Sequence, residues 1–171
     1  GFNIWFNGYD NQLYCVGRGP SAITVSASPA VQTIGSNVVI RGTVTDIAAG
    51  TQQDQQAARF PNGVPCASDA SMSDWMGYIY QQKPLPTNFT GVSIDLYVVD
   101  SNGNYRTIGT AKTDATGMYS LTWTPDISGE YKVTASFAGS KAYWPSYTET
   151  TFDTMEANPT ATPAATQAPT M

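Results

Sequence analysis

The stretch that decides the fold runs from Gly117 to Gly139 and reads Gly-Met-Tyr-Ser-Leu-Thr-Trp-Thr-Pro-Asp-Ile-Ser-Gly-Glu-Tyr-Lys-Val-Thr-Ala-Ser-Phe-Ala-Gly. Large apolar side chains alternate with polar ones on either side of a central Pro-Asp-Ile-Ser-Gly segment. A period of two places successive side chains on opposite faces of a strand, so each strand has one buried and one solvated face. We therefore predict a hairpin of two strands, whose apolar face must be covered by a second sheet.

Segments with the same alternation lie on both sides of this stretch, and Gly, Pro and Asn residues separate them. The further predicted strands are 22–27, 38–45, 92–99, 105–112 and 146–152, with a short edge continuation at 31–34. About seven strands with turns at regular intervals indicate an all-β fold, an immunoglobulin-like β-sandwich over residues 20–154. The run from Asp126 to Val133 matches the corner before the sixth strand of such domains, where the hydroxyl of Tyr131 would bond to upstream backbone. Trp123 would fill the core.

Residues 47–91 are predicted to form an insertion, most of it a polar loop. Within it Met72 to Gln82 breaks the strand period, and its apolar residues recur at helical spacing. Ser71 is a plausible N-cap, with an acidic residue three positions later. We predict one short helix in this insertion, lying across an open end of the sandwich.

Residues 1–19 form an N-terminal segment that is rich in Trp, Phe and Tyr and poor in charge. Asn7-Gly8 is the favoured pair for a two-residue hairpin turn, because both positions need positive φ. A lone hairpin is not stable in water, so this one must pack on the sandwich, on another domain or on another chain. At the other end, residues 155–171 are rich in Thr, Pro and Ala and predict a disordered stalk.

Composition excludes several classes of function. Only 12% of the 171 residues are charged, the net charge is −5 and the pI is near 4.4, which argues against nucleic-acid binding. The chain contains no histidine, so a Ser/His/Asp or Cys/His catalytic set is impossible and the commonest zinc ligand is missing. We therefore expect no enzyme activity, no cofactor and no metal. No run is long enough to cross a bilayer, no signal peptide is visible, and the start at Gly1 indicates a processed or excised piece.

Few positions suggest a site. Cys15 and Cys66 are predicted to form one disulfide in an oxidising compartment, and two unrelated thiols are the alternative. Asn88 heads an Asn-Phe-Thr acceptor sequence for N-glycosylation. Trp75, Trp144 and Tyr147, with Tyr78 and Tyr80, could form a platform on which a sugar stacks, although core packing is the simpler use. The loop from Asp100 to Asn104 resembles the start of a calcium loop, but a plain hairpin tip explains it.

Two runs resemble a known family: Thr-Asp-Ala-Thr-Gly-Met-Tyr-Ser-Leu-Thr-Trp-Thr-Pro from Thr113, and Gly-Glu-Tyr-Lys-Val-Thr-Ala-Ser-Phe-Ala-Gly-Ser-Lys-Ala-Tyr-Trp-Pro-Ser-Tyr from Gly129. They resemble the immunoglobulin-like domains of archaeal cell-surface proteins. In that family the domain often follows a β-propeller of the pyrroloquinoline-quinone-repeat type and precedes a Thr/Pro spacer. The run from Tyr9 to Gly17 is similar to the closing strand of such a propeller. The resemblance covers 9–152 and implies a cell-surface location without implying an activity.

The expected function is that of a non-enzymatic, extracellular module with a structural or adhesive role at the cell surface. Its partners would be another cell-surface protein or identical subunits. A second hypothesis is a filament or lattice subunit, in which residues 1–19 add a strand to a neighbour. A third is a carbohydrate-binding module, in which Trp144 contributes to a glycan site.

Overall fold

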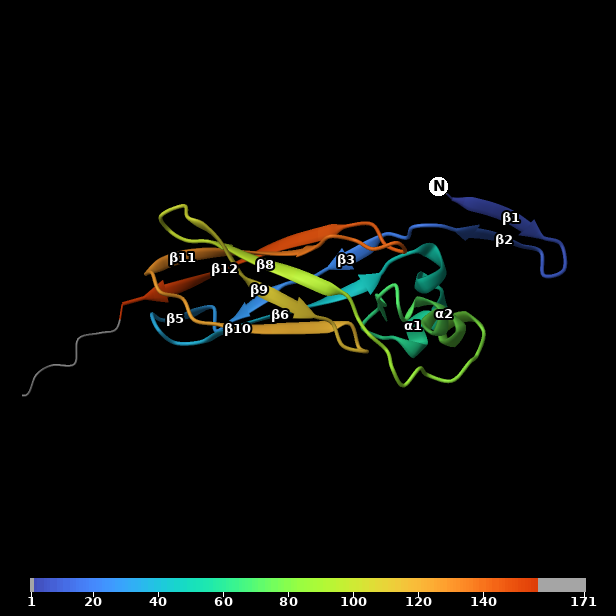
Figure 1. Cartoon of the computed structure of the whole chain (residues 1–171), viewed down its shortest axis with the longest axis horizontal. Coiled ribbons are helices and arrows are strands. Elements are labelled where there is room, and N and C mark those ends of the chain that lie inside the picture. Colours follow the sequence, from blue (N-terminus) through green and yellow to red (C-terminus); the bar gives the residue numbers. More distant parts are fainter. Residues whose placement is uncertain (1, 157–171) are drawn as a thin grey trace, which may run out of the picture.

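Two β-sheets stacked face to face form the body of the structure, a computed structural model that describes residues 2–156 (Figure 1). One sheet has the order β10-β6-β3, with β4 and β7 also paired to β6, and the other has the order β5-β12-β11-β8-β9. The strands are β1 (Asn3–Asn7), β2 (Gln12–Val16), β3 (Ser21–Ile23), β4 (Ser26–Ser28), β5 (Val31–Thr33), β6 (Val38–Asp46), β7 (Val64–Pro65), β8 (Ser93–Val99), β9 (Tyr105–Lys112), β10 (Met118–Trp123), β11 (Gly129–Phe137) and β12 (Ser146–Met155). The predicted all-β, immunoglobulin-like sandwich is confirmed.

The stretch from Gly117 to Gly139 does not form the predicted hairpin. β10 pairs with β6 in one sheet, whereas β11 pairs with β8 and β12 in the other. The connection between β10 and β11 therefore crosses from one layer to the other. The alternation of polar and apolar residues is the same in both arrangements, because either way one face of each strand is buried. The alternation of side chains correctly predicted the two strands, but it could not identify which strands lie next to them in the sheets.

Tyr131 holds the crossing in place. Its hydroxyl accepts a hydrogen bond from the backbone N–H of Ile127 at 3.0 Å and donates one to Asp126 at 3.2 Å. The predicted bond to upstream backbone is thus present. The Tyr131 ring is fully buried, stacks on Phe152 at 5.2 Å and meets Trp123 edge-on at 5.2 Å. The corner is therefore fixed both by a polar contact and by aromatic packing.

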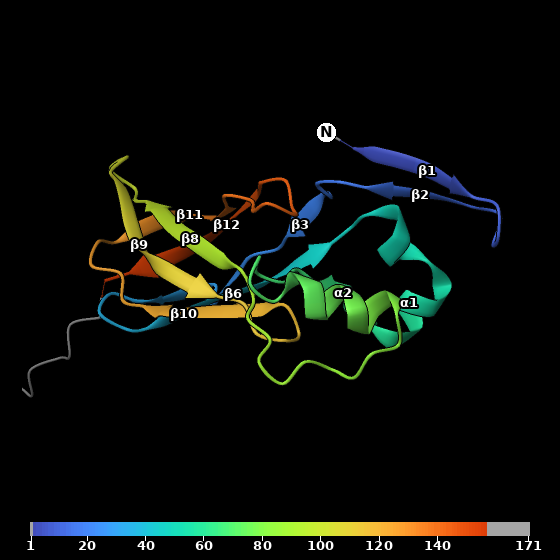
Figure 2. The same ribbon diagram turned by 45° about the vertical axis from the view of Figure 1, so that its right-hand side comes forward.

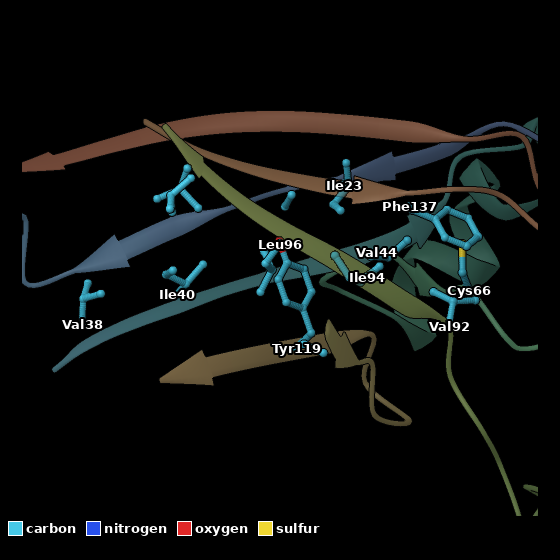
Figure 3. Packing of buried hydrophobic residues seen from close by; sticks show 14 of the residues in the cluster. Ile23, Val38, Ile40, Val44, Cys66, Val92, Ile94, Leu96, Tyr119 and Phe137 are labelled. Carbon is cyan, nitrogen blue, oxygen red and sulfur yellow. The ribbon is translucent and has the colours of Figure 1, made fainter. Parts of the chain in front are cut away.

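The core lies between the two sheets, and Figure 3 shows several of its side chains pointing into this space. The strands that contribute the most deeply buried aliphatic residues are β6, with Val38, Ile40 and Val44, and β8, with Ile94, Leu96 and Val98. Burying one such side chain contributes about 1.5–3 kcal/mol. The outward positions of the same strands carry mostly polar residues.

A network that joins distant parts of the sequence closes the end of the sandwich opposite the insertion. The guanidinium of Arg106 donates hydrogen bonds of 2.9 and 2.8 Å to Asp126, and it lies 5.8 Å from the centre of the Trp123 ring. These hydrogen bonds lower the pKa of Asp126 to about 2. Arg106 and Asp126 are 20 positions apart, so no sequence pattern links them.

The insertion differs from the prediction in its helix content. The predicted helix is present as α2 (Met72–Tyr80), but residues expected to be loop form a second helix, α1 (Asp54–Arg59), and a 3-10 helix, η1 (Ala49–Gln52). Ser71 does not cap α2 with its side chain, and its hydroxyl instead accepts a hydrogen bond from the Thr90 N–H at 2.9 Å. The prediction of one helix was wrong because the Gln-rich sequence of α1 has no apolar periodicity.

Tertiary contacts explain why α1 forms. The side chains of Gln56 and Arg59 each donate a hydrogen bond of 3.0 Å to the carbonyl oxygen of Ile79, near the end of α2. The last carbonyl groups of a helix have no partner within the helix, so α1 supplies donors that α2 needs. The two helices lie side by side near one end of the sandwich (Figure 2), and α2 contributes most of a second apolar cluster there, which Phe60 joins from the residue after α1.

Candidate functional site

The predicted disulfide is not formed. Cys15 is an exposed thiol on β2, and Cys66 is a buried thiol in the core of the sandwich. Figure 3 shows the Cys66 side chain pointing toward the ring of Phe137. The two cysteines lie in different parts of the molecule. Cys15 is in the hairpin, which projects beyond the insertion (Figure 1), whereas Cys66 comes directly after β7 and lies in the core of the sandwich. Burial raises the pKa of the Cys66 thiol, and the nearby Asp46 carboxylate adds to the rise. Cys66 is therefore an unreactive core residue.

These environments predict an unequal reactivity of the two thiols. In the native chain a disulfide-exchange reagent such as Ellman's should titrate one thiol, Cys15, because the reactive thiolate of Cys66 is both inaccessible and disfavoured. In denaturant the same reagent should titrate two. The Cys15→Ser variant should show none in the native state and one after denaturation. A wild-type chain without any reactive thiol in denaturant would instead establish the disulfide.

The predicted sugar platform is not assembled. Trp75 is 1% exposed and packs in the second apolar cluster, with the Phe89 ring centre 4.6 Å away, so it is a core residue. Trp144 and Tyr147 remain 46% and 74% exposed. Helical spacing placed Trp75 correctly on α2, but only the position of the 87–90 loop shows that the inward face of this helix is covered. Trp144 and Tyr147 can therefore be reached by a ligand, as can Tyr80 at the end of α2, which is 50% exposed.

The remaining candidates are the glycosylation sequence at Asn88, the loop at Asp100 and a metal site. Asn88 is exposed in the turn before β8, so its side chain is accessible to a glycosylating enzyme, and its modification stays a prediction. Burial of Asp100 would raise its pKa, but hydrogen bonds from Asn104 and Asn102 and the charge of Arg106 outweigh this and lower it. Its carboxylate thus stabilises the β8–β9 turn. Over residues 2–156 no three acidic or cysteine side chains lie close enough to hold a metal ion.

The most unusual surface of the molecule is the hairpin β1–β2. Trp5 pairs with Tyr14 across the strands, and their rings stack at 5.6 Å. On the opposite face Phe6 pairs with Leu13. Apolar pairs therefore lie on both faces of this two-stranded sheet, although both of its strands are largely exposed. The exposed apolar residues of the segment are Phe2, Ile4, Trp5, Phe6, Tyr9, Leu13, Tyr14 and Val16.

The tip of the hairpin differs from the predicted two-residue turn. The register places Asn7 opposite Gln12, so the loop is Gly8–Asn11, and Asn11 has a φ of 56°. The Asp10 carboxylate holds this loop by accepting hydrogen bonds from the Gln12 N–H at 3.0 Å and from the Tyr14 hydroxyl at 2.5 Å. The Asn-Gly pair located the turn, but the Asp10 contacts select a longer loop.

The hairpin is carried by an anchored linker. The N–H of Gly19 donates to the carbonyl oxygen of Ala142 at 2.8 Å, and the N–H of Trp144 donates to the carbonyl oxygen of Gly19 at 2.9 Å. The Ser21 hydroxyl adds a hydrogen bond of 2.8 Å to the carbonyl oxygen of Trp144. The residues after β2 thus join the loop between β11 and β12, and the hairpin projects from the insertion end of the sandwich (Figures 1 and 2).

No protein-family model matches the chain, and no curated protein matches it. Among solved structures, the native α2-macroglobulin of E. coli matches 88% of this chain with 15% identity and a TM-score of 0.46. A β-glucosidase from Listeria innocua in complex with glucose matches 84% of it with 10% identity and a TM-score of 0.37. This chain spans 8% of the first protein and 16% of the second. Matches this distant carry no argument about function.

In the part of the chain that the structure describes, no helix is long and apolar enough to cross a membrane.

Proposed function

We propose that this chain is a non-enzymatic, extracellular structural module of a cell-surface assembly, and that the hairpin β1–β2 joins it to a neighbouring protein. The apolar surface on both faces of the hairpin is the observation that carries the proposal. The archaeal cell-surface family that the sequence resembles is the proposed context. The low content of charged residues agrees with a role in which neutral polar side chains form the surface.

The pattern of the hairpin indicates the kind of partner. Strands that are covered on one face alternate apolar and polar residues, as β6 and β8 do, whereas strands covered on both faces are apolar at nearly every position. The central positions of β1 follow the second pattern, with Ile4, Trp5 and Phe6 in sequence, and β2 continues it from Leu13 to Val16. An isolated two-stranded sheet is also only marginally stable in water. We infer that the partner is a β-rich domain that pairs with an edge of the hairpin and covers both of its faces.

The overall shape supports a role as a spacer. The hairpin projects at one end of the long axis, and β12 ends at the opposite end (Figure 1). β12 and β11 are paired along their length from Ser146–Phe137 to Thr154–Gly129, so a continuous ladder of hydrogen bonds runs along the sandwich. The segment that follows the hairpin is bonded at Gly19 to the loop that precedes β12. Such a ladder resists extension, because many bonds must break together. The module would hold two attachment points at a defined separation.

The single exposed thiol makes the joining role testable. In the purified chain Cys15 should react rapidly with a maleimide, because it lies on an open face of the hairpin. In the intact surface assembly of the source cell its labelling should be slower by about tenfold or more, because the partner covers this face and reaction requires local opening. A matched control carries Thr122→Cys in a Cys15→Ser background, on the outer face of the sandwich, and should label equally in both settings. Unprotected Cys15, or equal protection of both positions, would overturn the proposal.

The free edges of β1 and β2 favour a second candidate, in which the neighbour is another copy of this chain and strand addition builds a filament. Sedimentation velocity over a wide range of concentrations tests it. Self-association should be present in the wild type and lost with Phe6→Lys and Leu13→Lys together. Tyr105→Lys with Tyr147→Lys adds the same charge on the sandwich and should leave it unchanged. A monomer at every concentration would exclude identical subunits as the partner and leave the first candidate intact.

A further inference from the structure

A small cavity lies where the hairpin joins the sandwich. It has a volume of about 400 Å³ and is lined by Phe2, Gly17, Arg18, Lys141 and Trp144. This volume is near the lower end of the ~300–1,000 Å³ found for small-molecule sites, so the cavity suits a small ligand or a short segment of a polymer. Trp144, an exposed member of the predicted sugar platform, supplies part of its wall.

The cavity is positively charged in an acidic protein. Arg18 and Lys141 are two of only eight basic residues in a chain of net charge −5, and no acidic side chain is among the lining residues. Neither forms a salt bridge with an acidic side chain in the part of the chain that the structure describes. The second cavity of the molecule has Arg41 and Lys112 in its wall, but Asp114 lies beside them. Two cations in a partly enclosed space create a local attraction for an anion despite the overall charge.

Part of the lining is held in place before any ligand arrives. The Arg18 guanidinium lies over the indole of Trp144, 5.1 Å from the ring centre. The backbone of Trp144 is bonded to Gly19 and to the hydroxyl of Ser21. The N–H of Lys141 donates to the Asp69 carboxylate at 3.1 Å, which fixes the start of the same loop while Asp69 itself stays outside the lining. The contact between the Arg18 and Trp144 side chains reduces the conformational entropy that these two residues lose on binding.

We propose that this cavity binds a sugar that carries a carboxylate, that is, a uronic acid residue of an acidic glycan. The guanidinium of Arg18 has the planar fork that matches a carboxylate, and Lys141 adds a second charge. The exposed part of the Trp144 indole offers an apolar surface to the C–H groups of a sugar ring. Because the protein is acidic overall, one or a few charged rings fit this site better than a long polyanion. The test below is made on the purified chain, in which no neighbour covers the hairpin.

The test uses the purified chain of 171 residues and trigalacturonic acid as the probe, and binding is followed by NMR titration of the backbone amides around the cavity, which every variant retains. Arg18→Gln and Lys141→Gln should each weaken binding by about tenfold, the value of one lost charge-assisted hydrogen bond. Trp144→Leu should weaken it by a similar factor. Lys112→Gln removes the same charge at the second cavity and should change binding by less than about twofold.

Two further probes separate the parts of the ligand. The methyl ester of trigalacturonic acid keeps the rings and removes the charge, and acetate keeps the carboxylate and removes the ring. Both should bind at least about tenfold more weakly than the acid. Equal binding of acetate would show a general anion site, equal binding of the ester would show that the cations are not used, and absence of binding by the acid would exclude the site. Each of these results would overturn the proposal, while thermal unfolding of each variant establishes that it is folded.

Discussion

Replacing Gly42 with alanine is expected to lower the free energy of unfolding by about 3 kcal/mol or more, since over-packing and a lost buried hydrogen bond act together. Gly42 lies in β6 opposite the gap between β3 and β4. A Cβ atom at this position would lie 1.8 Å from the carbonyl oxygen of Thr24 and 2.6 Å from the hydroxyl of Tyr119. That hydroxyl donates a 2.6 Å hydrogen bond to the same carbonyl oxygen. The methyl group therefore displaces backbone and breaks a bond that ties β10 to the segment between β3 and β4.

Urea unfolding followed by tryptophan fluorescence measures this effect. The matched control is Gly19→Ala, because a Cβ atom there would meet only ordinary contacts of 3.7 Å and beyond. The control should change the free energy of unfolding by no more than about 0.5 kcal/mol. If Gly42→Ala were as stable as this control, the close approach of β6 to Thr24 would be wrong, and with it the register of the first sheet.

Replacing Trp75 with alanine is expected to cost about 3–5 kcal/mol, the range for removing a large buried aromatic side chain. Trp75 is 1% exposed and is surrounded by the rings of Phe60, Tyr78 and Phe89. The apolar cluster that it fills is separate from the core between the sheets. The loss should therefore fall mainly on residues 47–91, while β8, β11 and β12 keep their packing.

Hydrogen exchange measured by mass spectrometry distinguishes local from global loss. In Trp75→Ala, amides of α1 and α2 should lose protection while those of β11 keep it. Ser73→Ala changes an exposed position of the same helix and should leave both regions unchanged. Uniform loss of protection across the chain would contradict the separation of the two clusters. Unchanged protection in α2 would contradict the burial of Trp75.

The prediction from sequence was strongest for the strands of the sandwich and weakest for what those strands pair with. Alternation in β8, β10 and β11 depends only on one face being buried, so it is visible locally. The partner of each strand depends on contacts between distant residues, such as those of β10 with β6. The corner at Tyr131 was recognisable because its residues are close in sequence. The helix α1 was not, because its stability comes from hydrogen bonds to the end of α2.

The candidate site divides in the same way. The apolar character of residues 1–19 was evident from composition, and the need for a covering partner followed from it. The predicted disulfide between Cys15 and Cys66 was wrong, because the number of residues between two cysteines does not show which part of the fold each thiol occupies. The meeting of Arg18 with Lys141 and Trp144 had no signal in the sequence, since these residues are brought together by the bonds between Gly19 and the 142–144 loop.

By itself, the sequence determined that the chain is all-β, that each strand of the sandwich has one buried face, and that residues 1–19 are rich in aromatic side chains and need a covering partner. These properties follow from the order of neighbouring side chains, because successive residues of a strand face alternately toward the core and toward solvent. The tertiary structure decided which strands share a sheet, which thiol is buried, and which side chains line the cavity beside the hairpin. These features depend on how segments far apart in the chain pack together. The stabilising free energy of such a contact arises only when both segments meet, so neither sequence reveals it alone.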